Sequence, residues 1–168
     1  MNSTTLPVPA YVTSIEEGFW GFILIAITIA IHGFGMNFTL RTGSALQQRQ
    51  ADSTSVLSNI AIMIFASCLV LVVHIVEVMV WACFLWLRGA FANTSISFYY
   101  TLLQYTTVGS EYNLPYRWRL LGGVVAMAGL LTFAWSTSVL FMLVQKFHSR
   151  QLAAAKTGQR HKENAGRS

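Results

Sequence analysis

The chain of 168 residues carries few charges: 10% of its side chains are charged, against about 25% in soluble domains. Its hydrophobic fraction is 54%, and its mean hydropathy is +0.53. This composition argues against a soluble domain and indicates a chain whose solvent is largely lipid. The net charge is +5, and six of the eleven Lys and Arg residues lie from Lys146 onward. Without fold-level support, such a tail does not indicate nucleic-acid binding.

The first third of the chain predicts one membrane span. Residues 1–17 are polar, and we expect an exposed N-terminal segment there. Residues 18–40 are apolar apart from a few positions such as His32, and they are long enough to cross a bilayer. Residues 41–55 are polar and predict a loop or interfacial turn.

The longest apolar run, residues 56–87, predicts a second spanning helix that contains an ionisable pair. His74 and Glu77 lie three positions apart and therefore share one face of that helix. Ionisable groups at this depth are costly and usually face protein or water. The pair is either a neutral, hydrogen-bonded element that fixes helix packing or a proton-sensitive latch. No metal site is predicted, since one H-x-x-E supplies too few ligands and His32 alone does not change that.

The next segment, residues 96–105, is apolar and aromatic but only about ten residues long. That length is too short to span a bilayer and suits a re-entrant half-helix, with Thr94 and Ser95 as its expected cap. Residues 118–147 then predict the last spanning helix. Residues 148–168 form a polar, basic tail, which we expect to be disordered.

Charge asymmetry predicts the orientation of these three spans. With the C-terminus inside, the inner face holds Arg41, Arg49 and the six cations from Lys146 onward, eight in all. The outer face then holds three arginines: Arg88, Arg117 and Arg119. The excess of Lys and Arg on cytoplasmic loops favours an inner-membrane protein with its N-terminus outside and its C-terminus in the cytoplasm.

The half-helix ends in the sequence Tyr105-Thr106-Thr107-Val108-Gly109, of which Tyr105 is its last residue. Pore filters of the potassium type use successive backbone carbonyls, helped by a Thr hydroxyl, to replace the hydration shell of an ion. Glycine permits the backbone dihedrals that such a stack needs. The order of half-helix, filter-like segment and apolar helix is the outline of a cation-channel pore loop.

Residues 56–147 resemble the two-helix pore domain of bacterial potassium channels, with residues 18–40 as an additional transmembrane helix. The matches are Tyr105-Thr106-Thr107-Val108-Gly109 and Met127-Ala128-Gly129, where the family often carries a hinge glycine. The resemblance implies a homotetramer that passes monovalent cations and holds no other cofactor. It implies an inner cavity with three polar residues: Thr132, Ser136 and Thr137. It assigns these residues to the ion filter and its outer mouth: Thr106, Thr107, Val108, Gly109, Ser110 and Glu111.

The sequence departs from the family immediately after Gly109. The family continues T-V-G-Y-G-D, whereas this chain reads Ser110-Glu111-Tyr112, without the second glycine. A ring of Glu111 carboxylates would concentrate cations by charge, so we expect weak selectivity. The three outer arginines anchor the protein at the lipid headgroups, or one of them pairs with Glu111 and braces the filter.

The expected fold class is an all-α membrane protein with three transmembrane helices, one re-entrant pore helix and a filter loop. The leading functional hypothesis is cation conduction. The altered filter favours a second hypothesis, a non-conducting accessory or structural subunit of a larger membrane complex. The sequence shows no nucleophile–base pair or phosphate loop, so we expect no enzymatic activity.

Overall fold

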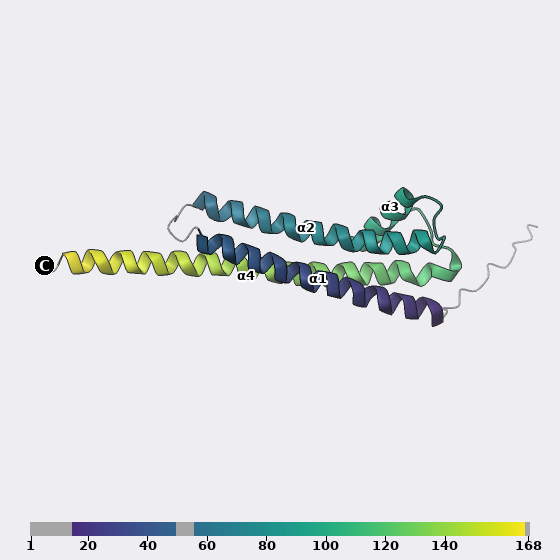
Figure 1. The fold of residues 1–168 in the computed structure, drawn as a ribbon, viewed down its shortest axis with the longest axis horizontal. Helices are drawn as coiled ribbons and strands as arrows, with labels where there is room; N and C mark the ends of the chain where they lie inside the picture. Colours follow the sequence, from purple (N-terminus) through teal and green to yellow (C-terminus); the bar gives the residue numbers. More distant parts are fainter. Residues whose placement is uncertain (1–14, 50–55, 167–168) are drawn as a thin grey trace, which may run out of the picture. The chain divides into compact units, whose positions relative to one another are not determined.

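A computed structural model describes residues 15–49 and 56–166, and Figure 1 shows the helices in chain order. Its described residues contain no strand. A short 3-10 turn, η1 (Tyr116–Trp118), precedes the last of four α-helices: α1 (Ile15–Arg49), α2 (Val56–Leu87), α3 (Thr94–Tyr105) and α4 (Arg119–Ala165).

Three segments are long and apolar enough to cross a membrane: Ile15–Gln48, Leu57–Leu87 and Tyr116–Ser149. The predicted all-α class is therefore confirmed for the described residues, and three helices have the length and apolar composition of membrane spans. The predicted limits of α2 agree with the structure. The short helix between the second and third spans is also present as α3.

The first helix is longer at both ends than the sequence predicts. Residues 41–49, predicted as a loop, continue α1, because they are mostly good helix formers and because Gly43 packs against Leu143 of α4. The rest of that predicted loop lies outside the described residues. At the other end, most of the predicted exposed N-terminal segment is likewise not described. Its last three residues begin α1, and Glu17 among them is fully buried.

The prediction of a disordered basic tail is wrong for most of its length. The last helix, α4, continues through these residues to Ala165. Adding residues to an existing helix avoids the unfavourable nucleation step, and the tail is rich in Ala, Lys, Gln and Arg, which are good helix formers. A helical tail therefore needs no packing partner to extend the third span.

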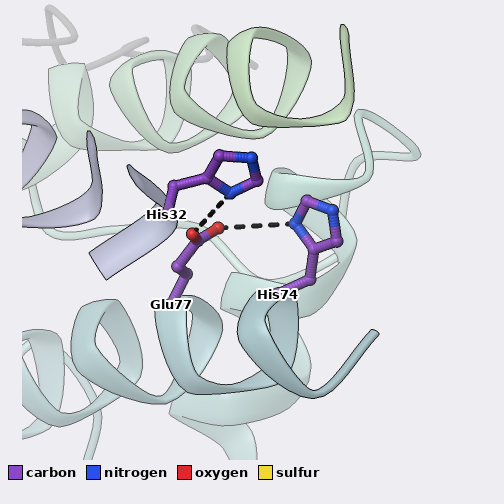
Figure 2. Close-up of side chains that lie close together, drawn as sticks. All are labelled: His32, His74 and Glu77. Atoms are coloured by element: carbon purple, nitrogen blue, oxygen red, sulfur yellow. Dashed lines mark hydrogen bonds and ion pairs between the residues drawn. The ribbon is translucent and has the colours of Figure 1, made fainter. Parts of the chain in front are cut away.

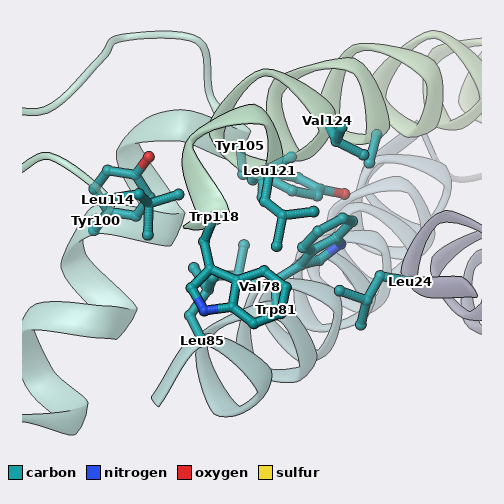
Figure 3. Packing of buried hydrophobic residues seen from close by; sticks show 12 residues of the cluster. Leu24, Val78, Trp81, Leu85, Tyr100, Tyr105, Leu114, Trp118, Leu121 and Val124 are labelled. Carbon is teal, nitrogen blue, oxygen red and sulfur yellow. The ribbon is translucent and has the colours of Figure 1, made fainter. Parts of the chain in front are cut away.

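Close contacts divide the chain into two units, and each long helix contributes residues to both. The first unit consists of Met1–Ile27 and Val78–Gly129, and the second of Thr28–Glu77 and Leu130–Ser168. The core of the first unit includes Trp81 and Leu85 of α2, Trp118 of η1 and Leu121 of α4, all at most 4% exposed. Figure 3 shows this cluster together with Tyr100 and Tyr105 of α3.

The buried hydroxyl of Ser97 attaches α3 to α2 within the first unit, and that of Thr101 bonds within α3. Ser97 donates a hydrogen bond to the Ala82 carbonyl at 2.7 Å, and Thr101 donates to the Ser97 carbonyl at 2.7 Å. The helix begins at an Asn93 cap, whose side chain accepts from the Ser95 N–H at 2.7 Å. The cap is therefore one residue earlier than predicted, because the Asn carboxamide satisfies a free N–H of the first turn. In the second unit, Met36, Val70 and Val139 form a smaller apolar core.

Candidate functional site

The filter-like segment forms the C-terminal cap of α3. The Thr107 N–H donates to the Gln104 carbonyl at 2.9 Å, and the Val108 N–H donates to the Leu103 carbonyl at 2.9 Å. These two bonds define a Schellman cap, in which the residue after the C-cap adopts a left-handed conformation. Thr107 occupies that position, with φ of 62°. The predicted filter thus starts as a helix end and not as an extended strand.

This cap also sets the direction of three successive carbonyls. In a trans peptide the carbonyl of one residue points opposite to the N–H of the next, and no cis peptide occurs among the described residues. The N–H groups of Thr107, Val108 and Gly109 all point back to the last turn of α3. The carbonyls of the residues preceding each of these, at positions 106 to 108, therefore point away from the helix, and residues 106–109 are exposed.

The backbone of Thr107 is strained, because it takes the left-handed position that is usually occupied by glycine in a Schellman cap. A left-handed conformation costs a residue with a Cβ roughly 1–2 kcal/mol, and a β-branched side chain makes the position unusual. Non-glycine residues in such conformations are often found at functional sites, where the surrounding structure holds them. The strain marks Thr107 as the residue of this turn that most needs an explanation beyond folding.

The structure places the two predicted mouth residues beside this turn. Ser110 accepts a hydrogen bond from the Tyr112 N–H at 3.1 Å, and Glu111 is exposed. An ion pair between Glu111 and an outer arginine, one of the two alternatives for those arginines, does not form among the described residues. Arg88 and Arg117 instead bind the two carboxylate oxygens of Glu16, at 2.9 and 2.7 Å.

The start of α1 supplies contacts that the sequence did not predict. The Glu17 carboxylate accepts the Leu120 N–H at 2.8 Å, in the first turn of α4, where a helix has free N–H groups and favours negative charge. The Arg88 guanidinium lies 4.7 Å from the Trp20 ring and 5.1 Å from the Trp118 ring. The sequence did contain a signal for the start of α1, since Glu16 and Glu17 are acidic and the first turn of a helix favours acidic residues.

The predicted hinge, Gly129, lies within the continuous helix α4 and packs against the end of α3. A Cβ at this position would overlap the Tyr105 carbonyl oxygen and lie 2.9 Å from the carbonyl carbon. The close approach of the two backbones accounts for the glycine. A hinge at this residue stays a prediction.

The second unit holds a buried polar cluster made from three helices, shown in part in Figure 2. His32 of α1 joins the predicted pair of His74 and Glu77, and the three are 0%, 6% and 0% exposed. The Glu77 carboxylate lies between the imidazole rings, 2.9 Å from Nδ1 of His32 and 3.4 Å from Nδ1 of His74. One potential ligand atom from each residue lies within 4.8 Å of the others.

Ser136 of α4 contacts both histidines on their other side. Its Oγ lies 2.9 Å from Nε2 of His74 and 3.3 Å from Nε2 of His32, and it donates to the Thr132 carbonyl at 2.9 Å. Thr132 and Ser136 are buried, at 0% and 4% exposure. Two of the three residues expected to line an inner cavity thus face the interior of the unit, and Thr137 alone is exposed.

Comparison of the chain with protein-family models, curated proteins and solved structures finds no match. The likeness to potassium channels therefore stays a resemblance carried by residues 105–109 and 127–129.

Proposed function

We propose that the chain is one subunit of a weakly selective cation pore of the potassium-channel type. The observation that supports this proposal is the exposed end of α3, where three successive carbonyls point away from the helix. Carbonyl oxygens are the groups that replace the hydration shell of a monovalent cation. In this proposal α3 enters the membrane from the outer face and returns without crossing it.

The electrostatics of this turn favour cations over anions. The C-terminal end of a helix carries a partial negative charge, and α3 ends at the proposed ion path. Glu111 adds a carboxylate beside the same turn, and each further copy adds another. Since a single chain supplies one turn, a closed path needs several copies, and we propose a homotetramer. Val108 is 72% exposed in the single chain, so a neighbouring copy has apolar surface to cover.

The departure after Gly109 limits the proposal to weak selectivity. Ser110 and Glu111 stand where the family has an aromatic residue and a glycine, so fewer carbonyl rings are expected than in the family. An ion that keeps more water at the outer end is selected less sharply by dehydration. Negative charge at the mouth raises the local concentration of sodium and potassium alike.

Reversal potentials in planar bilayers test the proposal, with purified protein and potassium opposite sodium. We expect cation currents whose reversal potential lies close to zero, because a weakly selective pore passes potassium and sodium with similar permeability. Glu111→Gln should lower the conductance most at low salt, because the mouth then loses its charge while the turn is kept. Glu16→Gln removes a carboxylate whose partners are Arg88 and Arg117, and it serves as the control for charge removal elsewhere. Anion currents, or the absence of current in every condition, would refute cation conduction.

The altered filter also favours a second function, that of a non-conducting subunit of a larger membrane complex. Stoichiometry separates the two. A symmetric assembly of four copies with Thr107 facing the axis supports the pore, whereas a single copy bound to other membrane proteins supports the accessory role. Mass measurement of the complex extracted in mild detergent gives this result without any assumption about activity.

A further inference from the structure

In the buried cluster of His32, His74, Glu77 and Ser136, the hydrogen-bond donors and acceptors are arranged so that a bound cation is favoured. A serine hydroxyl has one hydrogen to donate. Ser136 lies 2.9 Å from the Thr132 carbonyl, the usual acceptor for a helical serine, and its Oγ then accepts from both imidazoles. Both histidines accordingly carry a hydrogen on Nε2.

Neutral histidines of this tautomer present lone pairs at Nδ1. Both Nδ1 atoms face the Glu77 carboxylate, at 2.9 and 3.4 Å. An ionised carboxylate only accepts hydrogen bonds, so these two contacts place acceptor against acceptor. These contacts become attractive when a metal ion lies between the atoms, or when protons are added to the carboxyl group or to the rings.

We propose that His32, His74 and Glu77 form a binding site for a divalent transition-metal ion such as Zn²⁺. Two neutral imidazoles and one carboxylate are a donor set that zinc uses, with a fourth position left for another ligand. Tetrahedral zinc with bonds of 2.0–2.1 Å separates neighbouring ligand atoms by about 3.4 Å. Each imidazole faces its own oxygen of the Glu77 carboxylate, Oε1 at 2.9 Å from Nδ1 of His32 and Oε2 at 3.4 Å from Nδ1 of His74. One ligand atom from each of the three residues lies within 4.8 Å of the others, so a single ion between them requires the ligand atoms to move closer together.

Ser136 supplies the second feature of a metal site. Metal-binding histidines donate their other ring N–H to an oxygen, which fixes the tautomer and the ring orientation. Here one oxygen serves both rings, 2.9 Å from His74 and 3.3 Å from His32. The Trp135 ring, 5.3 Å from His32, and the Phe133 ring, 4.6 Å from His74, further confine the imidazoles.

The alternative to a metal ion in this cluster is added protons, and the geometry of the cluster favours the metal ion. Two imidazolium rings would lie with their centroids 5.3 Å apart in a buried environment, where like charges disfavour each other. A metal ion instead places its charge at the point that all three ligands share. The site is independent of conduction, since none of its residues belongs to the turn that ends α3.

Metal binding is measured on the full chain, purified in detergent without a histidine tag and treated with EDTA. Equilibrium dialysis against ZnCl₂ should give about one bound ion per chain, and CoCl₂ should give the visible absorption of four-coordinate cobalt. Glu77→Gln should abolish stoichiometric binding. Ser136→Ala keeps all three ligands and should weaken the affinity roughly 10- to 100-fold. The control, His148→Gln, removes an exposed histidine of α4 and should bind as the unaltered chain does.

Zinc should also raise the apparent melting temperature of the unaltered chain, and not that of the Glu77→Gln variant. Absence of bound zinc, or binding that Glu77→Gln and Ser136→Ala leave unchanged, would overturn the site. So would a melting temperature that rises on acidification and does not respond to zinc, which would assign the cluster to protons instead of a metal ion. If Glu77→Gln does not fold, the cobalt spectrum and the Ser136→Ala affinity decide.

Discussion

Replacing Gly129 by alanine tests how closely α4 approaches the end of α3. In an exposed helix this substitution usually stabilises by up to about 1 kcal/mol, because glycine loses more backbone entropy on folding. At Gly129 the new Cβ would overlap the Tyr105 carbonyl oxygen and lie 2.9 Å from the carbonyl carbon. Backbone atoms cannot rotate away as a side chain can, so the two helices must separate.

Overpacking of this kind typically costs 1–3 kcal/mol, and about 1 kcal/mol of helix propensity opposes it. We therefore expect Gly129→Ala to destabilise the chain by up to about 2 kcal/mol, with the full value if α3 cannot shift. Because Tyr105 is the residue before Thr106, the same shift moves the exposed turn. Conductance, if present, should fall together with stability.

Gly123 provides a matched control six positions earlier on α4. A Cβ there would meet no heavy atom within 4 Å. Gly123→Ala should raise the apparent melting temperature in detergent, whereas Gly129→Ala should lower it by several degrees. Equal effects of the two substitutions, or a stabilised Gly129→Ala variant, would show that α3 and α4 do not approach each other as described.

Three further predictions concern the capped turn, the first turn of α4 and the orientation of the chain. Thr107→Gly should stabilise the chain by about 1 kcal/mol in thermal unfolding, since it relieves a positive φ; a loss of stability would refute the strain. Glu17→Gln should lower the melting temperature, because the carboxylate at the Leu120 N–H loses its charge at a helix N-terminus; an unchanged value would contradict the capping role. Cysteines at Ser3 and Ser168, in a background without the native cysteines, should label from opposite sides of the membrane, and labelling from one side would exclude three spans.

The three spans could be predicted from sequence because few backbone structures are stable in lipid. Backbone groups in hydrocarbon must be paired internally, so an apolar stretch of sufficient length is a helix. The ends of the helices are not fixed by this argument. Residues 41–49 and the basic tail are polar, and polarity alone predicts loops; in the structure both continue the helix that precedes them. Hydropathy reports where lipid ends and not where a helix ends.

The candidate sites were predictable only as far as local spacing reaches. A separation of three residues placed His74 and Glu77 on one face, and both lie in the buried cluster. His32 is 45 positions from Glu77, and no periodicity connects them. A signal was nevertheless present. An ionisable group deep in a span needs a polar partner, and His74 and Glu77 were the other His, Asp or Glu residues within the predicted spans.

The contacts of α1 argue that it is more than an addition to a two-helix pore unit. In the first unit its Glu16 joins Arg88 to Arg117, and its Glu17 binds the first turn of α4. In the second unit Nδ1 of its His32 lies 2.9 Å from Oε1 of the buried Glu77. Removing one partner of a buried polar contact leaves the other group with its desolvation cost and without that partner. A chain that kept Glu77 and lost α1 would lose the His32 contact in the membrane, so Glu77 and α1 are expected to depend on each other.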